Sequence, residues 1–163
     1  MNLEAVFASP GLRLPIDAAV GLGEDDAPFW GEARVCGEVR NNSGVVSIAL
    51  SFATVLRFDC DRCAEPVLKD FRGEFTQTLV RSLSGEETSE YLVLPDAQLD
   101  LDALVREEMY LQLPPKLLCA EDCKGLCPGC GANLNSGCCT CKQTVDPRLS
   151  ALLPLLKDNE ETP

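Results

Sequence analysis

Ten cysteines in a chain of 163 residues constrain this sequence more than any other feature. In chain order they are Cys36, Cys60, Cys63, Cys119, Cys123, Cys127, Cys130, Cys138, Cys139 and Cys141. A cysteine-rich chain forms disulfides in an oxidising compartment, whereas in a reducing compartment its cysteines more often bind metal. Residues 1–15 lack the basic and continuous apolar regions of a secretory signal. We therefore expect a cytoplasmic protein whose cysteines are reduced.

The clearest metal-binding pattern is Cys127-Pro128-Gly129-Cys130. A two-residue gap in a tight turn lets both thiolates reach one ion at about 2.3 Å from each sulfur. The pair Cys139 and Cys141 supplies two more sulfurs and completes a set of four. Cys138 is an alternative to Cys139, but a C-x-C pair places both sulfurs on the same side of an extended chain, which favours Cys139.

A second set combines Cys60 and Cys63 with Cys119 and Cys123. Its four sulfurs also suffice for a tetrahedral site, and a metal there would join the C-terminal module to the upstream domain. Because these ligands meet only in the native state, metal binding would be coupled to folding. We expect one or two zinc ions in closed four-sulfur sites, which leave no open position for a catalytic water.

Some cysteines have a second interpretation. Cys60 and Cys63 are also compatible with a redox dithiol, although no thioredoxin-like βαβ pattern surrounds them. The Cys127–Gly131 turn also resembles a rubredoxin iron-binding turn, although rubredoxins use a second C-x2-C pair. Cys36 lies in a predicted strand, and we expect it to be a buried apolar side chain.

Composition narrows the range of functions. Histidine is absent, which removes the usual general base and the imidazole-dependent triads, so we expect no enzyme. The formal net charge is −12, which leaves little basic surface to neutralise phosphates. Direct RNA contact, expected to be weak, would depend on Lys116, Lys124 and Lys142, whereas Asn133 and Asn135 are expected to form turns. A basic protein is the better-matched partner.

The middle of the chain has the alternating pattern of antiparallel strands. Residues 33–40 and 44–58 are rich in Val, Ile, Thr and Phe, and Asn41–Gly44 between them is a turn signature, which predicts a hairpin. By the period of two, alternate residues from Val46 to Phe52 form a core face. The other expected elements are strands over residues 12–20, 65–83 and 91–94, a short helix within residues 1–8, and a helix that Asp100 caps.

These patterns predict an α+β protein: an antiparallel β-rich domain with a few short helices and a C-terminal cysteine-rich zinc module. We expect the β-rich domain with its acidic loops at residues 1–115, the zinc module at 116–145, and a C-terminal helix and tail at 146–163. The module has too few large apolar residues to form a core of its own. No stretch approaches the roughly 18 apolar residues of a membrane span, so no membrane association is expected.

The string CAEDCKGLCPGCGANLNSGCCTC at residues 119–141 closely resembles the C-terminal signature of the YceD-like family, the large ribosomal RNA subunit accumulation proteins. The Cys60–Cys63 pair with Pro66 and the helix motif at residues 100–114 resemble other motifs of the family. The matched signature positions are Cys60, Cys63, Cys119, Cys123, Lys124, Gly125, Leu126, Cys127, Pro128, Cys130, Gly131, Asn133, Leu134, Asn135, Cys139 and Cys141. The extra Cys138 departs from the pattern.

The resemblance implies a role in the accumulation of large-subunit ribosomal RNA, and hence in ribosome assembly. Genes of the family commonly neighbour one for a small, basic large-subunit ribosomal protein, which makes such a protein, or a pre-ribosomal particle, the expected partner. The acidic loop at residues 86–90 and the helix face at Glu107 and Glu108 are the expected contacts. Electrostatic capture of this kind is fast and depends strongly on salt.

Overall fold

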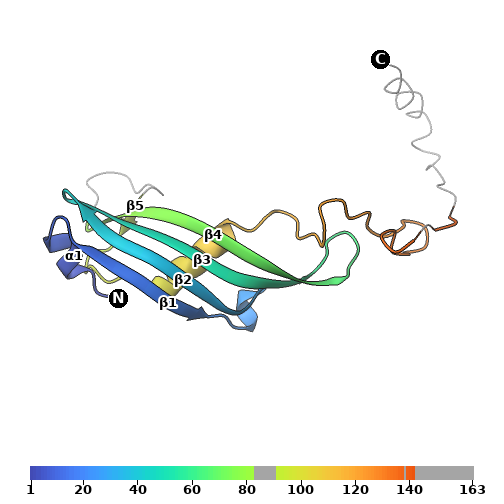
Figure 1. Cartoon of the computed structure of the whole chain (residues 1–163), viewed down its shortest axis with the longest axis horizontal. Coiled ribbons are helices and arrows are strands. Elements are labelled where there is room, and N and C mark those ends of the chain that lie inside the picture. Colours follow the sequence, from blue (N-terminus) through green and yellow to red (C-terminus); the bar gives the residue numbers. More distant parts are fainter. Residues whose placement is uncertain (83–90, 138, 142–163) are drawn as a thin grey trace, which may run out of the picture.

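A computed structural model describes residues 1–82, 91–137 and 139–141, which are built around one five-stranded sheet. The strands are β1 (Arg13–Gly21), β2 (Phe29–Asn42), β3 (Val45–Asp59), β4 (Pro66–Val80) and β5 (Tyr91–Val93). The helical elements of these residues are α1 (Glu4–Ala8), the 3-10 turn η1 (Glu24–Asp26) and α2 (Leu101–Leu111) (Figure 1). Strands β1 to β4 pair antiparallel in chain order, and β5 runs parallel to β4. The predicted, mostly antiparallel sheet with few helices is confirmed.

The β2–β3 hairpin follows directly from its sequence. Ser43 and Gly44 have positive φ angles of 54° and 96° at the turn that joins Asn42 to its partner Val45. A two-residue turn with this backbone matches the right-handed twist of the flanking strands. Alternate residues from Val46 to Phe52 are buried, as the period of two predicts.

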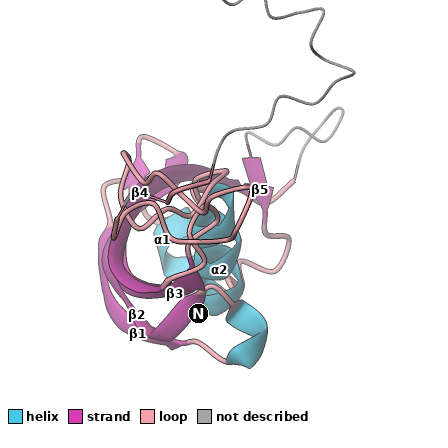
Figure 2. Ribbon diagram, turned by 90° about the vertical axis from the view of Figure 1, so that its right-hand side faces the viewer, coloured by secondary structure: helices cyan, strands magenta, loops and turns pink. Residues whose placement is uncertain are grey.

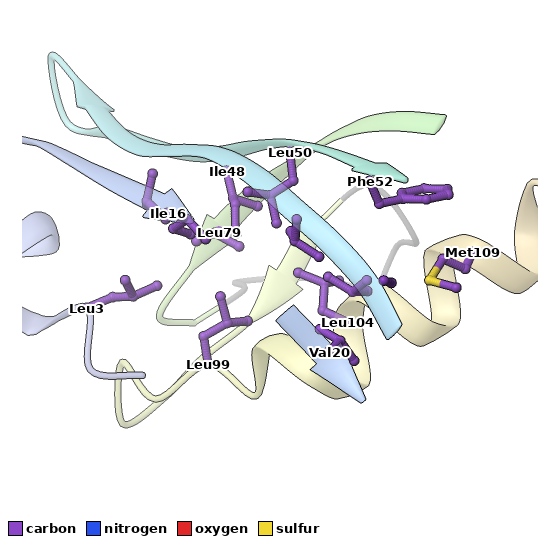
Figure 3. Packing of buried hydrophobic residues seen from close by; sticks show 14 of the residues in the cluster. Leu3, Ile16, Val20, Ile48, Leu50, Phe52, Leu79, Leu99, Leu104 and Met109 are labelled. Carbon is purple, nitrogen blue, oxygen red and sulfur yellow. The ribbon is translucent and has the colours of Figure 1, made fainter. Parts of the chain in front are cut away.

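The core lies between the sheet and the two α-helices. The long strands curve around α1 and α2, so that both helices lie on the concave face (Figure 2). Ile48 of β3 and Met109 of α2 are fully buried there, as is Leu3, which precedes α1. Figure 3 shows how these side chains fill the space between the layers. Burial of this apolar surface is the main force that holds the helices on the sheet.

Helix α2 begins where the sequence predicts. The Asp100 carboxylate accepts a hydrogen bond from the Ala103 amide at 3.0 Å and so satisfies one free N–H group of the first turn. Farther along, the Arg106 guanidinium donates to the Gly21 carbonyl at 2.7 Å and pairs with Asp26 at 3.2 Å. Helix α2 therefore fixes the acidic turn η1 at the end of β1.

Cys36 corrects one prediction, because its side chain is exposed and not buried. Val35 and Val39 of the same strand are fully buried, and a residue one position from Val35 must point to the opposite face. On that convex face the Cys36 Sγ lies 3.8 Å from Asp17 Oδ1 of the neighbouring strand. The prediction rested on the apolar character of cysteine and left out the position of Cys36 in the alternating pattern of β2.

After α2 the chain reaches the loop between β3 and β4. Two hydrogen bonds join the segments there: the Asp61 amide donates to the Leu117 carbonyl at 2.9 Å, and the Leu117 amide donates to Asp61 Oδ2 at 2.6 Å. The cysteine-rich segment continues from this point beyond the end of the sheet (Figure 1). In the part of the chain that is described, no helix has the length and apolarity to cross a membrane. The predicted acidic loop at 86–90 and the C-terminal helix lie outside the described residues.

Candidate metal centres

The loop between β3 and β4 forms the first cysteine turn. The Cys60 amide donates to the Glu65 carbonyl at 2.9 Å, and the Ala64 amide donates to the Cys60 carbonyl at 2.8 Å. These bonds fold the chain back, so that Cys63 lies beside Cys60. Ala64 has a φ angle of 56°, in the left-handed region that favours glycine.

The turn at Cys127–Cys130 repeats this backbone pattern. The Cys127 amide donates to the Ala132 carbonyl at 2.8 Å, and the Gly131 amide donates to the Cys127 carbonyl at 2.8 Å. Gly131 has a φ angle of 72° and occupies the position of Ala64 in the first turn. The two turns are therefore equivalent in structure, although only the second carries the glycine that makes the turn recognisable in the sequence.

The first cluster consists of Cys60, Cys63, Cys119 and Cys123, whose Sγ atoms all lie within 4.8 Å of one another. The Sγ atoms of Cys60 and Cys123 are 3.8 Å apart, and those of Cys63 and Cys119 are 3.7 Å apart. Four sulfurs at about 2.3 Å from a tetrahedral zinc ion are separated by about 3.8 Å, whereas a disulfide requires about 2.05 Å. The spacing therefore fits a metal ion and does not fit a disulfide.

The second cluster consists of Cys127, Cys130, Cys139 and Cys141, again with all Sγ atoms within 4.8 Å. The Sγ atoms of Cys139 and Cys127 are 3.2 Å apart. Cys127 is buried, whereas Cys130 and Cys141 are exposed, so this cluster has less cover than the first. Cys139 takes part as expected, and Cys138 lies outside the described residues. Both predicted sets of four are thus brought together, and metal binding by them remains a prediction.

Hydrogen bonds divide the thiols of the first cluster into two kinds. The Cys119 amide, which donates to Cys60 Sγ at 3.3 Å, lowers the pKa of Cys60 to about 6. The Asn135 side chain lowers the pKa of Cys123. By contrast, the hydrogen bond with Cys123 raises the pKa of Cys119 to about 12. Although a backbone amide lowers the pKa of Cys63, burial and the neighbouring thiols raise it overall.

The second cluster shows the same division. The hydrogen bond between Cys127 and Cys139 lowers the pKa of Cys127 to about 6, whereas the hydrogen bond between Cys141 and Cys130 raises the pKa of Cys141 to about 12. Thiolates are the form of cysteine that binds metal, so each cluster contains at least one sulfur that is deprotonated at neutral pH.

Asn133 and Asn135 form a turn, as predicted, because Asn133 Oδ1 accepts a hydrogen bond from the Asn135 amide at 2.9 Å. The Asn133 side chain also reaches the first cysteine turn, and the Asn135 side chain reaches the first cluster. Asn133 Nδ2 donates to Glu65 Oε1 at 3.1 Å, and Asn135 Nδ2 donates to Cys123 Sγ at 3.2 Å. Sequence reasoning missed these two contacts, since neither periodicity nor spacing indicates them.

An acidic face covers η1 and the outer side of α2. Its exposed carboxylates are Glu24, Asp25, Asp102 and Glu107. The Tyr110 hydroxyl donates to the Asp25 carbonyl at 3.3 Å and holds η1 against α2. Glu108, the other expected contact on α2, is only partly exposed.

Comparison with known proteins gives one family. The family model described as "Large ribosomal RNA subunit accumulation protein YceD" matches residues 48–156. Proteins of Mycobacterium tuberculosis and Mycobacterium bovis, both described as uncharacterized, are 32% identical over 108 residues, which cover 64% of this chain and 52% of theirs. A Zea mays protein, described as large ribosomal RNA subunit accumulation protein YCED homolog 1, chloroplastic, is 27% identical, with 64% of this chain and 46% of its own covered. The chain thus spans about half the length of these relatives. No solved structure matches it.

Proposed function

This chain belongs to the YceD family of large ribosomal RNA subunit accumulation proteins, and on that premise we propose that it is a non-enzymatic, zinc-binding factor in the assembly of the large ribosomal subunit. The role of the whole molecule is a proposal because the chain spans only about half the length of the curated relatives it matches. The maize relative's name refers to ribosomal RNA accumulation and supports this assignment.

The observation that carries the zinc proposal is the sulfur spacing of 3.7 and 3.8 Å in the first cluster. Thiolates suit zinc, and four of them close its coordination shell. The ligands would be Cys60, Cys63, Cys119 and Cys123 at one site and Cys127, Cys130, Cys139 and Cys141 at the other. When bound, zinc would supply cross-linking of the cysteine-rich segment and no chemistry on a substrate, because no coordination position is left for water.

The experiment for the metal is a comparison of native and denatured masses of the protein purified without added metal. The difference in mass counts bound ions, and the denatured mass counts disulfides. Two zinc ions with reduced thiols are expected. A red protein that contains iron, or disulfides without metal, would instead support the rubredoxin-like or dithiol redox alternative.

We propose further that the acidic face receives a basic large-subunit ribosomal protein or a basic part of a pre-ribosomal particle. The net charge of −12 supports this, and each zinc bound to four thiolates would add a local charge of about −2. Direct RNA contact is the weaker alternative. Of the lysines expected to support it, Lys116 and Lys124 are exposed, and Lys142 lies outside the described residues.

The test of the partner is a titration with the small, basic ribosomal protein whose gene commonly neighbours those of the family, at increasing salt. Charge reversal by Glu24→Lys with Asp25→Lys should weaken binding at low salt. Glu38→Lys with Glu74→Lys makes the same change in net charge on the convex face of the sheet and is the matched control. An affinity that does not change with salt, or that falls equally in both variants, would rule out capture by the acidic face.

A further inference from the structure

The loop that joins the two halves of the second cluster also contacts the first cluster. In sequence, Asn135 lies between Cys130 and Cys139, and both of those cysteines belong to the second cluster. Its Nδ2 nevertheless donates to Cys123 Sγ of the first cluster at 3.2 Å, and its Oδ1 accepts a hydrogen bond from the Lys124 amide at 2.8 Å. One side chain therefore fixes both a proposed ligand and the backbone beside it.

Other contacts hold this loop against the first cysteine turn. Asn133 donates to Glu65 at 3.1 Å, and the Leu134 amide donates to the Gly125 carbonyl at 2.9 Å. Gly125 has a φ angle of 74°, and a Cβ at this position would lie 2.9 Å from the Arg62 carbonyl oxygen. A real Cβ would not fit at that distance. The backbone at Gly125, which the loop contacts through Leu134, therefore packs against the first cysteine turn at Arg62 in a way that only glycine allows.

The sulfurs of the second cluster, by contrast, receive their hydrogen bonds locally. The Gly129 amide of the same turn donates to Cys127 Sγ at 3.4 Å, and the Cys130 amide of that turn also stabilises the Cys127 thiolate. The second cluster is thus self-contained. The first cluster, by contrast, receives a hydrogen bond at Cys123 Sγ from Asn135, in the loop between the two cysteine pairs of the second cluster.

We propose that Asn135 is a positioning residue that couples the two metal sites, so that zinc in the second site fixes the loop and raises the zinc affinity of the first. This inference rests on the proposed zinc sites. Because coupling between two sites is reciprocal, zinc in the first site raises the affinity of the second by the same factor. The order of filling then follows from the intrinsic affinities of the two sites. Hydrogen-bond partners of metal ligands typically change metal affinity about 10- to 100-fold.

The test measures the zinc dissociation constant of each site by competition with a chelator, in the full chain. Asn135→Asp keeps an acceptor for the Lys124 amide but replaces the N–H donor with a carboxylate. Ser136→Ala is the matched control, because it removes a bond of the same loop, Ser136 Oγ to the Asn133 carbonyl at 3.0 Å, that does not touch the first cluster. We expect Asn135→Asp to weaken the first site by at least about tenfold and Ser136→Ala to leave it within about twofold. Equal effects of the two variants would overturn the proposal.

A second comparison measures the coupling itself. Replacing Cys127 and Cys130 with serine removes the second site, and this should weaken the first site in the otherwise unchanged chain. In the Asn135→Asp chain the same replacement should cause little further loss, because the coupling bond is already absent. An equal loss in both chains would show that coupling does not pass through Asn135.

Cobalt(II) as a probe separates positioning from general loosening. Loss of the N–H donor makes the Cys123 thiolate a stronger electron donor, so Asn135→Asp should move the sulfur-to-cobalt charge-transfer band of the first site to lower energy. Reduced occupancy without a shift of the band would indicate a merely structural role and overturn the proposal. A wild-type chain that binds no zinc would overturn the metal sites themselves, whereas two zinc ions that bind independently would overturn only the coupling.

Discussion

Cys36 and Cys123 are both free cysteines, but their surroundings differ. Cys123 is buried among three other thiols, whereas Cys36 is exposed on the convex face of the sheet. We expect Cys123→Ser to reduce the zinc content by one ion per chain, because it removes one of four ligands from a closed site. Cys36→Ser should leave the zinc content unchanged and alter the free energy of unfolding by less than about 0.5 kcal/mol. Native mass spectrometry and denaturant unfolding check the pair, and equal zinc loss in both variants would contradict the ligand assignment.

The divided pKa values of the first cluster predict how many protons zinc displaces. Near pH 8, Cys60, with a pKa of about 6, is deprotonated, and the pKa of Cys123 is also lowered. Cys119, with a pKa of about 12, and Cys63, whose pKa is raised, must each lose a proton to bind zinc. Zinc binding at the first site should therefore release at least two protons, from Cys119 and Cys63, so that the apparent affinity falls by at least about 100-fold for each unit by which the pH is lowered.

The sign of the pH dependence follows from the same groups. Below about pH 6 Cys60 also carries a proton, so the loss of affinity with acid becomes steeper there. Calorimetric titration of zinc in buffers with different ionisation enthalpies counts the protons. Release of none, or of four near pH 8, would contradict the division of the thiols.

Each cysteine turn contains one residue in a left-handed conformation, Ala64 in the first and Gly131 in the second. A Cβ at Gly131 would meet nothing within 4 Å, so Gly131→Ala tests the backbone alone. We expect it to cost about 1 kcal/mol, roughly a fivefold loss of zinc affinity at the second site. Ala64→Gly should raise the affinity of the first site by a smaller factor, because glycine also makes the unfolded chain more flexible. Chelator competition measures both, and changes in the same direction would contradict the equivalence of the turns.

Local signals account for most of what could be predicted at the scale of elements. The β2–β3 hairpin has its own turn residues, and α2 has its own cap at Asp100, so neither requires knowledge of distant segments. The pairing of β5 could not be predicted, because a three-residue strand carries too little pattern to choose a partner or a direction. The two cysteine clusters could be predicted because a closed tetrahedral metal site needs four thiolates, and cysteines can be counted and paired by their spacing in the sequence. The contact of Asn135 with Cys123 was not, because an amide side chain has many possible partners and only the folded loop selects one.

At the scale of the whole molecule, the apolar core and the cysteine clusters are separate. The main cluster of buried apolar residues joins the sheet to α1 and α2 and contains no cysteine. Three cysteines of the first cluster, Cys60, Cys63 and Cys123, form a separate small group of buried residues. Among the described residues, the apolar side chains packed against this group are Val67 and Leu118. We therefore infer that the sheet does not depend on metal, whereas the described part of the predicted module, residues 116–141, does. The division at residue 116 remains a prediction.

Metal removal tests this division. A strong chelator under reducing conditions should leave the far-UV circular dichroism of the sheet and its cooperative unfolding transition largely in place, because the main core contains no cysteine and, of the described residues from 116 onward, Leu117 alone packs against it. The amides of residues 116–141 should lose their protection against hydrogen exchange, since little apolar burial remains to order them once the cross-links are gone. Hydrogen exchange with mass spectrometry, before and after chelation and again after zinc is restored, resolves the two regions. If the sheet unfolds together with the cysteine-rich segment, the chain is a single cooperative unit and the proposed division is wrong. If neither region changes although zinc is lost, zinc does not order the segment, and its role must lie in partner binding alone.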